Sequence, residues 1–402
     1  MRSLARNHCN AGIPWHAVAF AKAAACPVEE ASLPAREQQA GSLQDVSGSP
    51  RRIRPVADST RELPLVAAQL RRVIRGDVRF FLFLMLSTQA FAGGLQPYAR
   101  LILADSPGAA RDGVRVTYLG TNGYQFEFKG HALLVDPYFS RVDLLSVALG
   151  SRIQPNASRV DDGLRHIAPK ADTILVTHGH FDHLLDVPAV MAKTRARLIA
   201  SASSVDLAKR AGASSGDAVK PGDVRRIGPW KIRVLSATHD RLFGKVPFDR
   251  PHSQAGLSAE ASAKPEPPQR AADWICGEPL AFLIEVNGER IYIDSGGTAT
   301  RLPPNARVDL AILGMALPDS RARLAAALAH LQPRYVLPSH QDDFFRPLSA
   351  GFQFGPLTDF PFVQRECAQQ NRSRLILLDY FKPWTLPKAA GSKSQSPNPR
   401  KD

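Results

Sequence analysis

Short apolar runs separated by turn residues predict a series of strands in the middle of this chain. Three such runs are joined by glycine-containing turns: Val114 to Tyr118, Tyr124 to Phe128 and Ala132 to Val135. This pattern predicts a meander of short strands. Later, Leu280 to Val286 and Arg290 to Asp294 flank Asn287-Gly288, which predicts a hairpin.

Apolar residues at helical spacing alternate with further strand-like runs. Helices are expected over Leu184 to Lys193, Ser203 to Ala211 and Asp319 to Leu331. Further strands are expected at Asp172 to Thr177, Leu198 to Ala200, Val224 to Ile227, Lys231 to Ser236, Leu310 to Leu313 and Tyr335 to Leu337. Alternating strands and helices are typical of an α/β domain.

A cluster of metal-ligand residues follows the strand expected at Asp172 to Thr177. Residues 178–183 have the pattern H-x-H-x-D-H, with His178, His180, Asp182 and His183 at its polar positions. Open α/β layers place their chemistry at the carboxyl ends of strands, and imidazole with carboxylate suits zinc, iron or manganese. Burying these groups without a metal would leave polar atoms that are costly to satisfy. Four such residues are too close to serve one ion, which indicates two metals with further ligands downstream.

Three downstream residues are candidates for the remaining ligands. His239, Asp294 and His340 each follow or end an extended apolar run. We therefore expect them along the same edge of the sheet layers.

Taken in order, these motifs resemble the metallo-β-lactamase superfamily. The likeness is closest to its branch of metal-dependent hydrolases with L-ascorbate-6-phosphate lactonase and N-acyl phosphatidylethanolamine phospholipase D. The matching pieces are Tyr118 to Gly123, Leu134 to Pro137, His178 to His183, Thr238-His239, Ile293 to Gly296 and Pro338 to His340. They cover about residues 113–381, which are expected to form one catalytic domain.

The resemblance implies an αββα sandwich with two metal ions at one edge. It implies that His178, His180 and His239 hold the first ion, that Asp182, His183 and His340 hold the second, and that Asp294 bridges them. Asp136 would orient a ligand histidine; the open alternative is an ordinary Asp-Pro turn with Pro137.

The ligand set predicts a metal-dependent hydrolase. Two divalent ions, zinc in the first place or else manganese or iron, lower the pKa of a shared water to about 7 and supply hydroxide for attack. The ions also stabilise developing charge, and Asp182 is the candidate catalytic residue that steers the nucleophile or a proton. The expected substrate is a phosphodiester, an ester or a lactone.

Two other functions are alternatives. A non-catalytic member that binds metal or ligand would be expected to have lost some of these seven residues. A redox member with a di-iron centre would carry a glutamate in an H-x-E pattern, whereas this chain has His180-Phe181-Asp182.

The net charge of +14 over 402 residues favours an anionic small-molecule or lipid substrate. Nucleic acid is not expected, because the basic residues are scattered and aromatics are few. The segment Tyr138 to Val160 has Arg141, Arg152 and Arg159 around apolar residues. It is interpreted as a lid or a lipid-facing flap that would allow membrane-surface contact, or else as an amphipathic helix on the core.

The remaining segments lack core character. Residues 1–77 are expected to be poorly structured. If translation begins near residue 73 or 78, most or all of them would lie before the natural start of the protein. Residues 78–92 combine basic residues, a short apolar run and A-x-A, a signal-peptide pattern that predicts export to the periplasm, with a cytoplasmic protein as the alternative. Lys245 to Asp273, which contains His252, is expected to be a loop, and 386–402 a disordered tail. Cys276 and Cys367 allow one disulfide but do not require it.

Overall fold

The computed structural model describes residues 93–106, 113–242, 244–247, 266–297, 307–370 and 372–388. The predictions made for residues 1–77, for the signal-like segment 78–92 and for His252 therefore lie outside the described residues. So does most of the tail predicted at 386–402. No helix in the described ranges is long and apolar enough to cross a membrane.

The first sheet contains seven strands in the order β14-β1-β2-β3-β4-β5-β6. Their bounds are β1 Val114–Gly120, β2 Gly123–Phe128, β3 His131–Val135, β4 Thr173–Leu175, β5 Arg197–Ala200, β6 Asp217–Ala218 and β14 Trp384–Leu386. β1, β2 and β3 form the predicted antiparallel meander. β3 to β6 are parallel, so the carboxyl ends of β3, β4 and β5 share one edge.

The second sheet also contains seven strands, in the order β13-β12-β11-β10-β9-β8-β7. Their bounds are β7 Val224–Ile227, β8 Trp230–Ser236, β9 Leu280–Val286, β10 Glu289–Ile293, β11 Leu310–Gly314, β12 Tyr335–Ser339 and β13 Arg374–Leu375. β9 and β10 form the hairpin predicted around Asn287-Gly288, with Val286 opposite Glu289. β10, β11 and β12 are parallel, so they end at a common edge.

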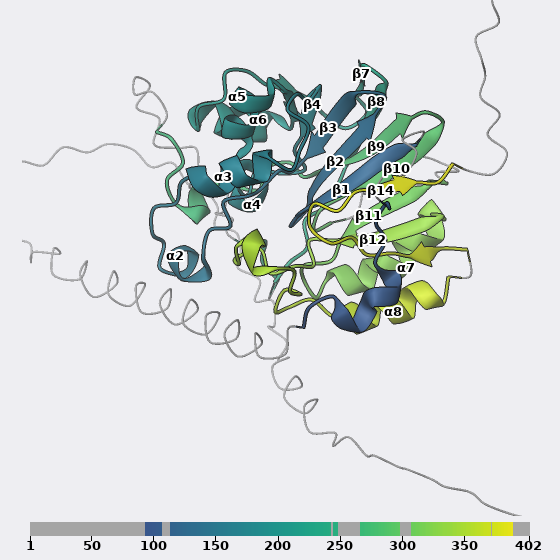
Figure 1. The fold of residues 1–402 in the computed structure, drawn as a ribbon. Coiled ribbons are helices and arrows are strands. Elements are labelled where there is room, and N and C mark those ends of the chain that lie inside the picture. Colours follow the sequence, from purple (N-terminus) through teal and green to yellow (C-terminus); the bar gives the residue numbers. More distant parts are fainter. Residues whose placement is uncertain are drawn as a thin grey trace, which may run out of the picture. The chain divides into compact units, whose positions relative to one another are not determined.

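Helices cover the outer faces of the two sheets (Figure 1). Helices α2 Leu144–Ala148, α3 Ala157–Leu164, α4 Phe181–Leu184, α5 Val187–Thr194 and α6 Ala202–Arg210 belong to the first half, and α7 Ser320–Leu331 and α8 Phe360–Ala368 to the second. One apolar core joins side chains of both sheets, such as Phe126 and Ile284. A second core joins the first sheet to its helices, as Ile174 and Val190 show. The layers therefore form the predicted αββα sandwich.

Most elements lie where the apolar pattern predicts them, but several helices and short strands differ. The helix expected over Leu184 to Lys193 is two helices, α4 and α5, and α5 has Pro188 in its first turn. A proline lacks the backbone donor that a continuous helix would need there. Helix α8 was not predicted, although Asp359 caps it by accepting from Phe362 N and Pro361 lies in its first turn.

The segment Tyr138 to Val160 forms short helices rather than one amphipathic helix. In α2, Leu144 and Val147 are buried, whereas Leu145 is 56% exposed, and Leu149, which follows the helix, is 69% exposed. Cys276 and Cys367 are buried and free, so the disulfide that the sequence allowed is not formed.

Candidate metal centre

The histidine cluster lies in the loop and short helix that follow β4. Gly179 allows this path, because a Cβ there would lie 2.3 Å from the carbonyl oxygen of Ile275. Its backbone N–H donates to the carbonyl of Cys276 at 3.0 Å. His180 then stands at the N-cap of α4, which carries Asp182 and His183 in its single turn.

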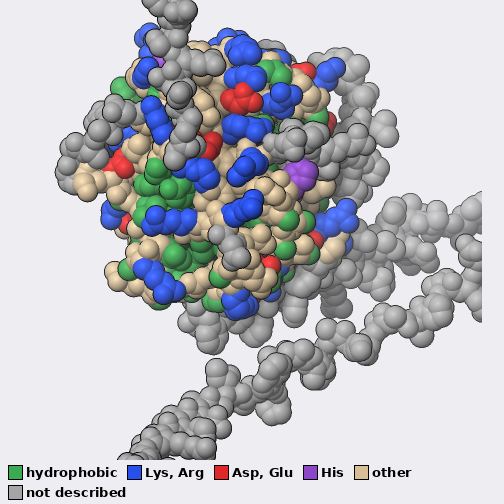
Figure 2. Space-filling view, turned by 90° about the vertical axis from the view of Figure 1, so that its right-hand side faces the viewer, with side chains coloured by type: hydrophobic (Ala, Val, Ile, Leu, Met, Phe, Trp, Pro, Cys, Tyr) green, Lys and Arg blue, Asp and Glu red, His purple; other side chains and the backbone are tan. Residues whose placement is uncertain are grey.

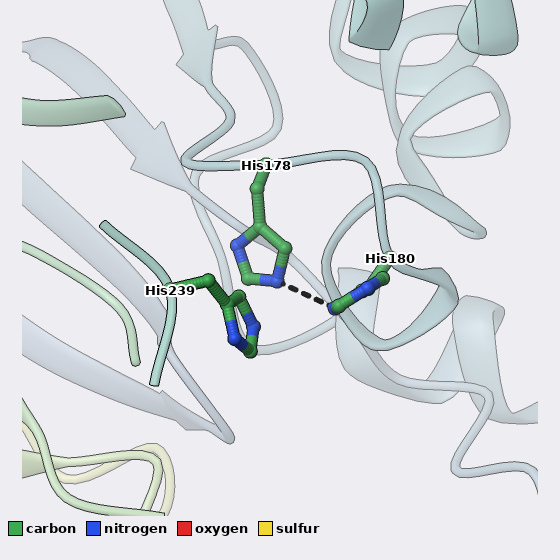
Figure 3. A group of neighbouring side chains, drawn as sticks. All are labelled: His178, His180 and His239. Carbon is green, nitrogen blue, oxygen red and sulfur yellow. Dashed lines mark hydrogen bonds between the residues drawn. The ribbon is translucent and has the colours of Figure 1, made fainter. Parts of the chain in front are cut away.

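His178, His180 and His239 form the first group of possible ligands. Each offers a nitrogen, and these atoms lie within 4.8 Å of one another. Figure 3 shows the three rings converging, with His178 Nε2 2.9 Å from His180 Nδ1. Burial lowers the pKa of all three histidines, that of His239 to about 4. The rings are therefore neutral, which is the form that binds metal ions.

Asp182, His183 and His340 form the second group, again with donor atoms within 4.8 Å. Asp182 Oδ2 lies 3.0 Å from His340 Nε2 and 3.4 Å from His183 Nε2. Burial alone would lower the pKa of His183, but the carboxylates of Asp182 and Asp136 raise it to about 10. Burial alone would raise the pKa of Asp182, but His183 and His340 hold it well below its usual value. The carboxylates of Asp182 and Asp136 therefore favour a positive charge at this group, which a metal cation could supply.

Asp136 stands beside His183 at the end of β3. Its Oδ2 lies 2.9 Å from His183 Nδ1 and also accepts from Asn122 Nδ2 and Thr177 Oγ1, while Oδ1 accepts from Thr177 N. Because Asp136 fixes Nδ1, it leaves Nε2 of His183 toward Asp182, in the carboxylate–histidine arrangement common at metal sites. The sequence suggested that Asp136 contacts a candidate ligand histidine, and Asp136 does contact His183. That His183 is a metal ligand stays a prediction.

Asp294 lies at the end of β10 but is not a member of either group. Its Oδ1 accepts from Gly314 N and its Oδ2 from Tyr292 Oη, both at 2.9 Å. Burial raises the pKa of Asp294 to about 6, although Arg323, 3.8 Å away, opposes this shift. Its role as a bridge between metals stays a prediction.

Both groups line one pocket, whose empty space together with the adjoining open solvent is about 720 Å³. Much of the wall around the donors is apolar, with Leu242, Pro247, Ala316, Leu317, Phe344, Phe345, Pro356 and Leu357. The Phe344 ring packs edge-on against His340, 5.1 Å between centroids. Among the described residues, no lysine or arginine lines this pocket, and neither does any residue of 138–160. Sequence reasoning missed this wall, although two adjacent phenylalanines so soon after His340 were a signal.

Arg141, the first of the three arginines in the segment 138–160, is buried. Arg141 is fully inaccessible and its Nη1 lies 2.9 Å from Asp342 Oδ2. Gly120 makes room for it, since a Cβ there would lie 1.7 Å from Arg141 Nη2. Asp342 also accepts from Thr121 N and Tyr380 Oη. Arg141 therefore fixes the loop that follows His340, and Asp342 neutralises its charge.

Known proteins are similar to this chain in sequence and in fold. Residues 115–252 match the family described as "Beta-lactamase superfamily domain". The two sheets with helices on their outer faces are similar to the metallo-β-lactamase fold. A UPF0173 metal-dependent hydrolase of Anaeromyxobacter sp. (strain K) is 27% identical over 260 residues, covering 61% of this chain and 80% of the relative. One from Aeropyrum pernix is 31% identical over 157 residues, covering 37% and 55%.

Among solved structures, the metallo hydrolase Igni18 of Ignicoccus hospitalis overlaps 69% of this chain and 99% of its own. It does so with a TM-score of 0.44 and 17% sequence identity. The chain is thus similar to proteins named as metal-dependent hydrolases. These comparisons do not single out the branch that contains L-ascorbate-6-phosphate lactonase and N-acyl phosphatidylethanolamine phospholipase D.

Proposed function

We propose that this protein is a hydrolase that uses two divalent metal ions, with zinc as the expected ion and manganese or iron as alternatives. The observation that carries the proposal is the pair of three-donor groups converging on one pocket. The donor set fits such ions, because it offers imidazole nitrogens and a carboxylate in buried positions. When bound, two ions activate a water and polarise the carbonyl or phosphoryl oxygen that it attacks.

The side chains of the site prepare this chemistry. Burial keeps His178, His180 and His239 neutral, so no proton must leave them before an ion binds. Asp182 remains ionised and lies on the pocket wall. It can therefore orient a nucleophilic water or accept its proton, the catalytic role that we propose for it.

We further propose that the substrate is an ester, a lactone or a phosphodiester with an apolar substituent. Phe344, Phe345 and Leu357 line the pocket that holds the donors, and buried apolar surface contributes roughly 25 cal/mol per Å² to binding. The net charge of +14 still favours an anionic substrate. In the described part of the pocket, that negative charge would be met by metal ions rather than by lysine or arginine. The particular branch suggested by the motifs, with its lactonase and phospholipase, is likewise part of this proposal.

The test combines metal analysis with a substrate panel. The purified protein is expected to contain up to two ions per chain and to lose activity in chelator, and zinc is expected to restore it. A bis(aryl) phosphate, an acyl lactone, a phospholipid and aryl esters of increasing chain length separate the substrate classes. A matched neutral and anionic ester tests the preference for charge.

Phe344→Ala tests the apolar wall separately. This change should raise KM for a long-chain substrate more than for an acetyl ester, with metal content unchanged. Activity that is identical with and without metal would overturn the hydrolase proposal. Full metal content with no turnover on the whole panel would favour the non-catalytic alternative.

A further inference from the structure

The guanidinium of Arg323, from helix α7, lies where three strands of the second sheet end. Its Nε and Nη2 donate to the two carboxylate oxygens of Asp240 at 3.0 and 2.9 Å. Nη2 also donates to the carbonyl of Gly314 at 2.5 Å, and Nη1 lies 3.8 Å from Asp294. The side chain is 15% exposed, so these are largely buried charges and not surface pairs.

Two of the segments that Arg323 contacts, those after β8 and after β10, are not held together by strand pairing. Asp240 follows β8 and Asp294 follows β10, and β9 separates these strands in the sheet. The segments nevertheless approach closely, because a Cβ at Gly297 would lie only 1.5 Å from the carbonyl oxygen of Thr238. The backbone N–H of Asp240 donates to the carbonyl of Gly296 in this contact. Arg323 therefore joins loops that the hydrogen-bond ladder leaves separate.

This arrangement bears directly on His239. His239 Nδ1 lies 2.6 Å from the backbone carbonyl of Asp240. Since a carbonyl only accepts, Nδ1 carries the proton and Nε2 is left as the metal-binding atom. The other two histidines of the group come from the loop after β4 (Figure 3). The position of His239 relative to them thus depends on the loop that Asp240 anchors.

We propose that Arg323 is a positioning residue for the metal centre, acting through Asp240, and that Asp294 belongs to the same buried charge cluster. An arginine suits this place because its planar fork can bind one carboxylate with two hydrogen bonds while remaining near a second. The inference rests on the proposed function only in assuming that the three histidines bind a metal ion. It gives Asp294 a part in holding the loop in place, beside which the bridge between ions stays a prediction.

The test measures metal affinity at the first group in a His340→Ala background, which removes one donor of the second group. Arg323→Gln should weaken binding of Co²⁺ by about 10–100-fold, the usual cost of losing a residue that orients a ligand. It should also change the visible absorption spectrum of the bound Co²⁺, which reports ligand geometry. Arg323→Lys, which keeps the charge and loses the fork, should lie between wild type and Arg323→Gln.

Arg321 of the same helix is the matched control. Its side chain is 40% exposed and pairs with Asp359 at 3.6 Å, away from the donor groups. Arg321→Gln should leave both affinity and spectrum unchanged. Asp240→Asn should resemble Arg323→Gln, and the double variant should be no worse than the worse single one, since both remove the same contact.

Several results would overturn the proposal. One is a folded Arg323→Gln protein with Co²⁺ affinity within twofold of its background and an unchanged spectrum. If Arg323→Gln does not fold, Arg323→Lys and Asp240→Asn decide by the same measurement. Asp294→Asn separates the two possible roles of Asp294. If metal affinity falls at the first group alone, Asp294 acts in the charge cluster with Arg323. If the otherwise wild-type protein loses its second ion, Asp294 bridges the two ions. A wild-type protein that binds no metal refutes the proposed function instead.

Discussion

Replacement of Asp136 by asparagine should weaken metal binding at the second group without any change to a ligand. The carboxylate accepts four hydrogen bonds, from Thr177 N, Thr177 Oγ1, Asn122 Nδ2 and His183 Nδ1. An asparagine that keeps its oxygen on Thr177 N places an NH₂ group against the other donors. The threonine hydroxyl can rotate and accept, but the N–H groups of Asn122 and His183 cannot.

When His183 binds an ion through Nε2, the nitrogen that faces Asp182, its remaining proton stays on Nδ1 and needs an acceptor. The asparagine NH₂ group cannot accept that proton, so the metal-bound form is destabilised and affinity should fall by about 10–100-fold, which corresponds to roughly 1.4–2.7 kcal/mol. Hydrogen bonds to charged groups contribute about 1.5–3 kcal/mol each. Loss of the hydrogen bonds from Asn122 and His183 should therefore lower the free energy of unfolding of the metal-free protein by about 3–6 kcal/mol.

The assay is competition with a chelator, followed through the metal stoichiometry, beside urea unfolding of the metal-free protein. Asp186→Asn is the control, because Asp186 is equally buried and accepts from Phe139 N, Ser140 N and Ser140 Oγ but contacts none of the six donors. It should lose stability and keep metal affinity. An Asp136→Asn protein that binds its second ion within twofold of wild type would refute the reasoning.

Three further predictions follow from the same contacts. The pKa of His183 is raised to about 10, so a metal ion that binds there at pH 7 should release about one proton. Metal affinity should therefore rise roughly tenfold per pH unit up to that pKa. Calorimetry in two buffers of different ionisation enthalpy measures the number of protons released, and a number near zero would contradict the prediction. His180→Ala should lose the first ion and all turnover by metal and activity analysis while far-ultraviolet circular dichroism is unchanged, and full activity would exclude His180 as a ligand. Gly120→Ala should lower the free energy of unfolding by about 3 kcal/mol or more, because Gly120 has φ +91° and a Cβ there would lie 1.7 Å from Arg141 Nη2. The control is Gly130→Ala, which has a similar φ of +80° but open space around it and should cost only about 1 kcal/mol. Equal losses of stability would contradict the role of Arg141 in fixing the loop after His340.

The candidate metal ligands could be found from the sequence because each one follows or ends a local apolar run that predicts a strand. His178 and His239 follow apolar runs, and parallel strands end at a common edge whatever their order. The αββα layers follow from the same alternation of strands and helices, once the resemblance is added. Only the partition of the donors into two groups required the family resemblance, and the distances agree with that partition.

Features that depend on contacts distant in sequence could not be found in this way. β14 pairs with β1 through Val114 and Leu386, and no local pattern connects them. Arg141 meets Asp342 in the core, and the two residues are 201 positions apart in the sequence. Arg321 and Arg323 are both arginines of helix α7, and the sequence does not distinguish them. Of the two, Arg323 contacts the strand ends beside the site, whereas Arg321 pairs with Asp359.

The donors of the first group come from different halves of the sandwich. His178 and His180 follow β4 of the first sheet, and His239 follows β8 of the second. An ion bound by all three would be a further cross-link between two sheets that are already joined by apolar contacts and by hydrogen bonds such as that from His340 N to the Thr121 carbonyl. Ion present at about 100 times its dissociation constant would stabilise the folded chain by about 2.7 kcal/mol. In a cell that is short of the metal, a larger fraction of the chain would then be unfolded and open to proteases, so metal supply would set the amount of this protein as well as its turnover.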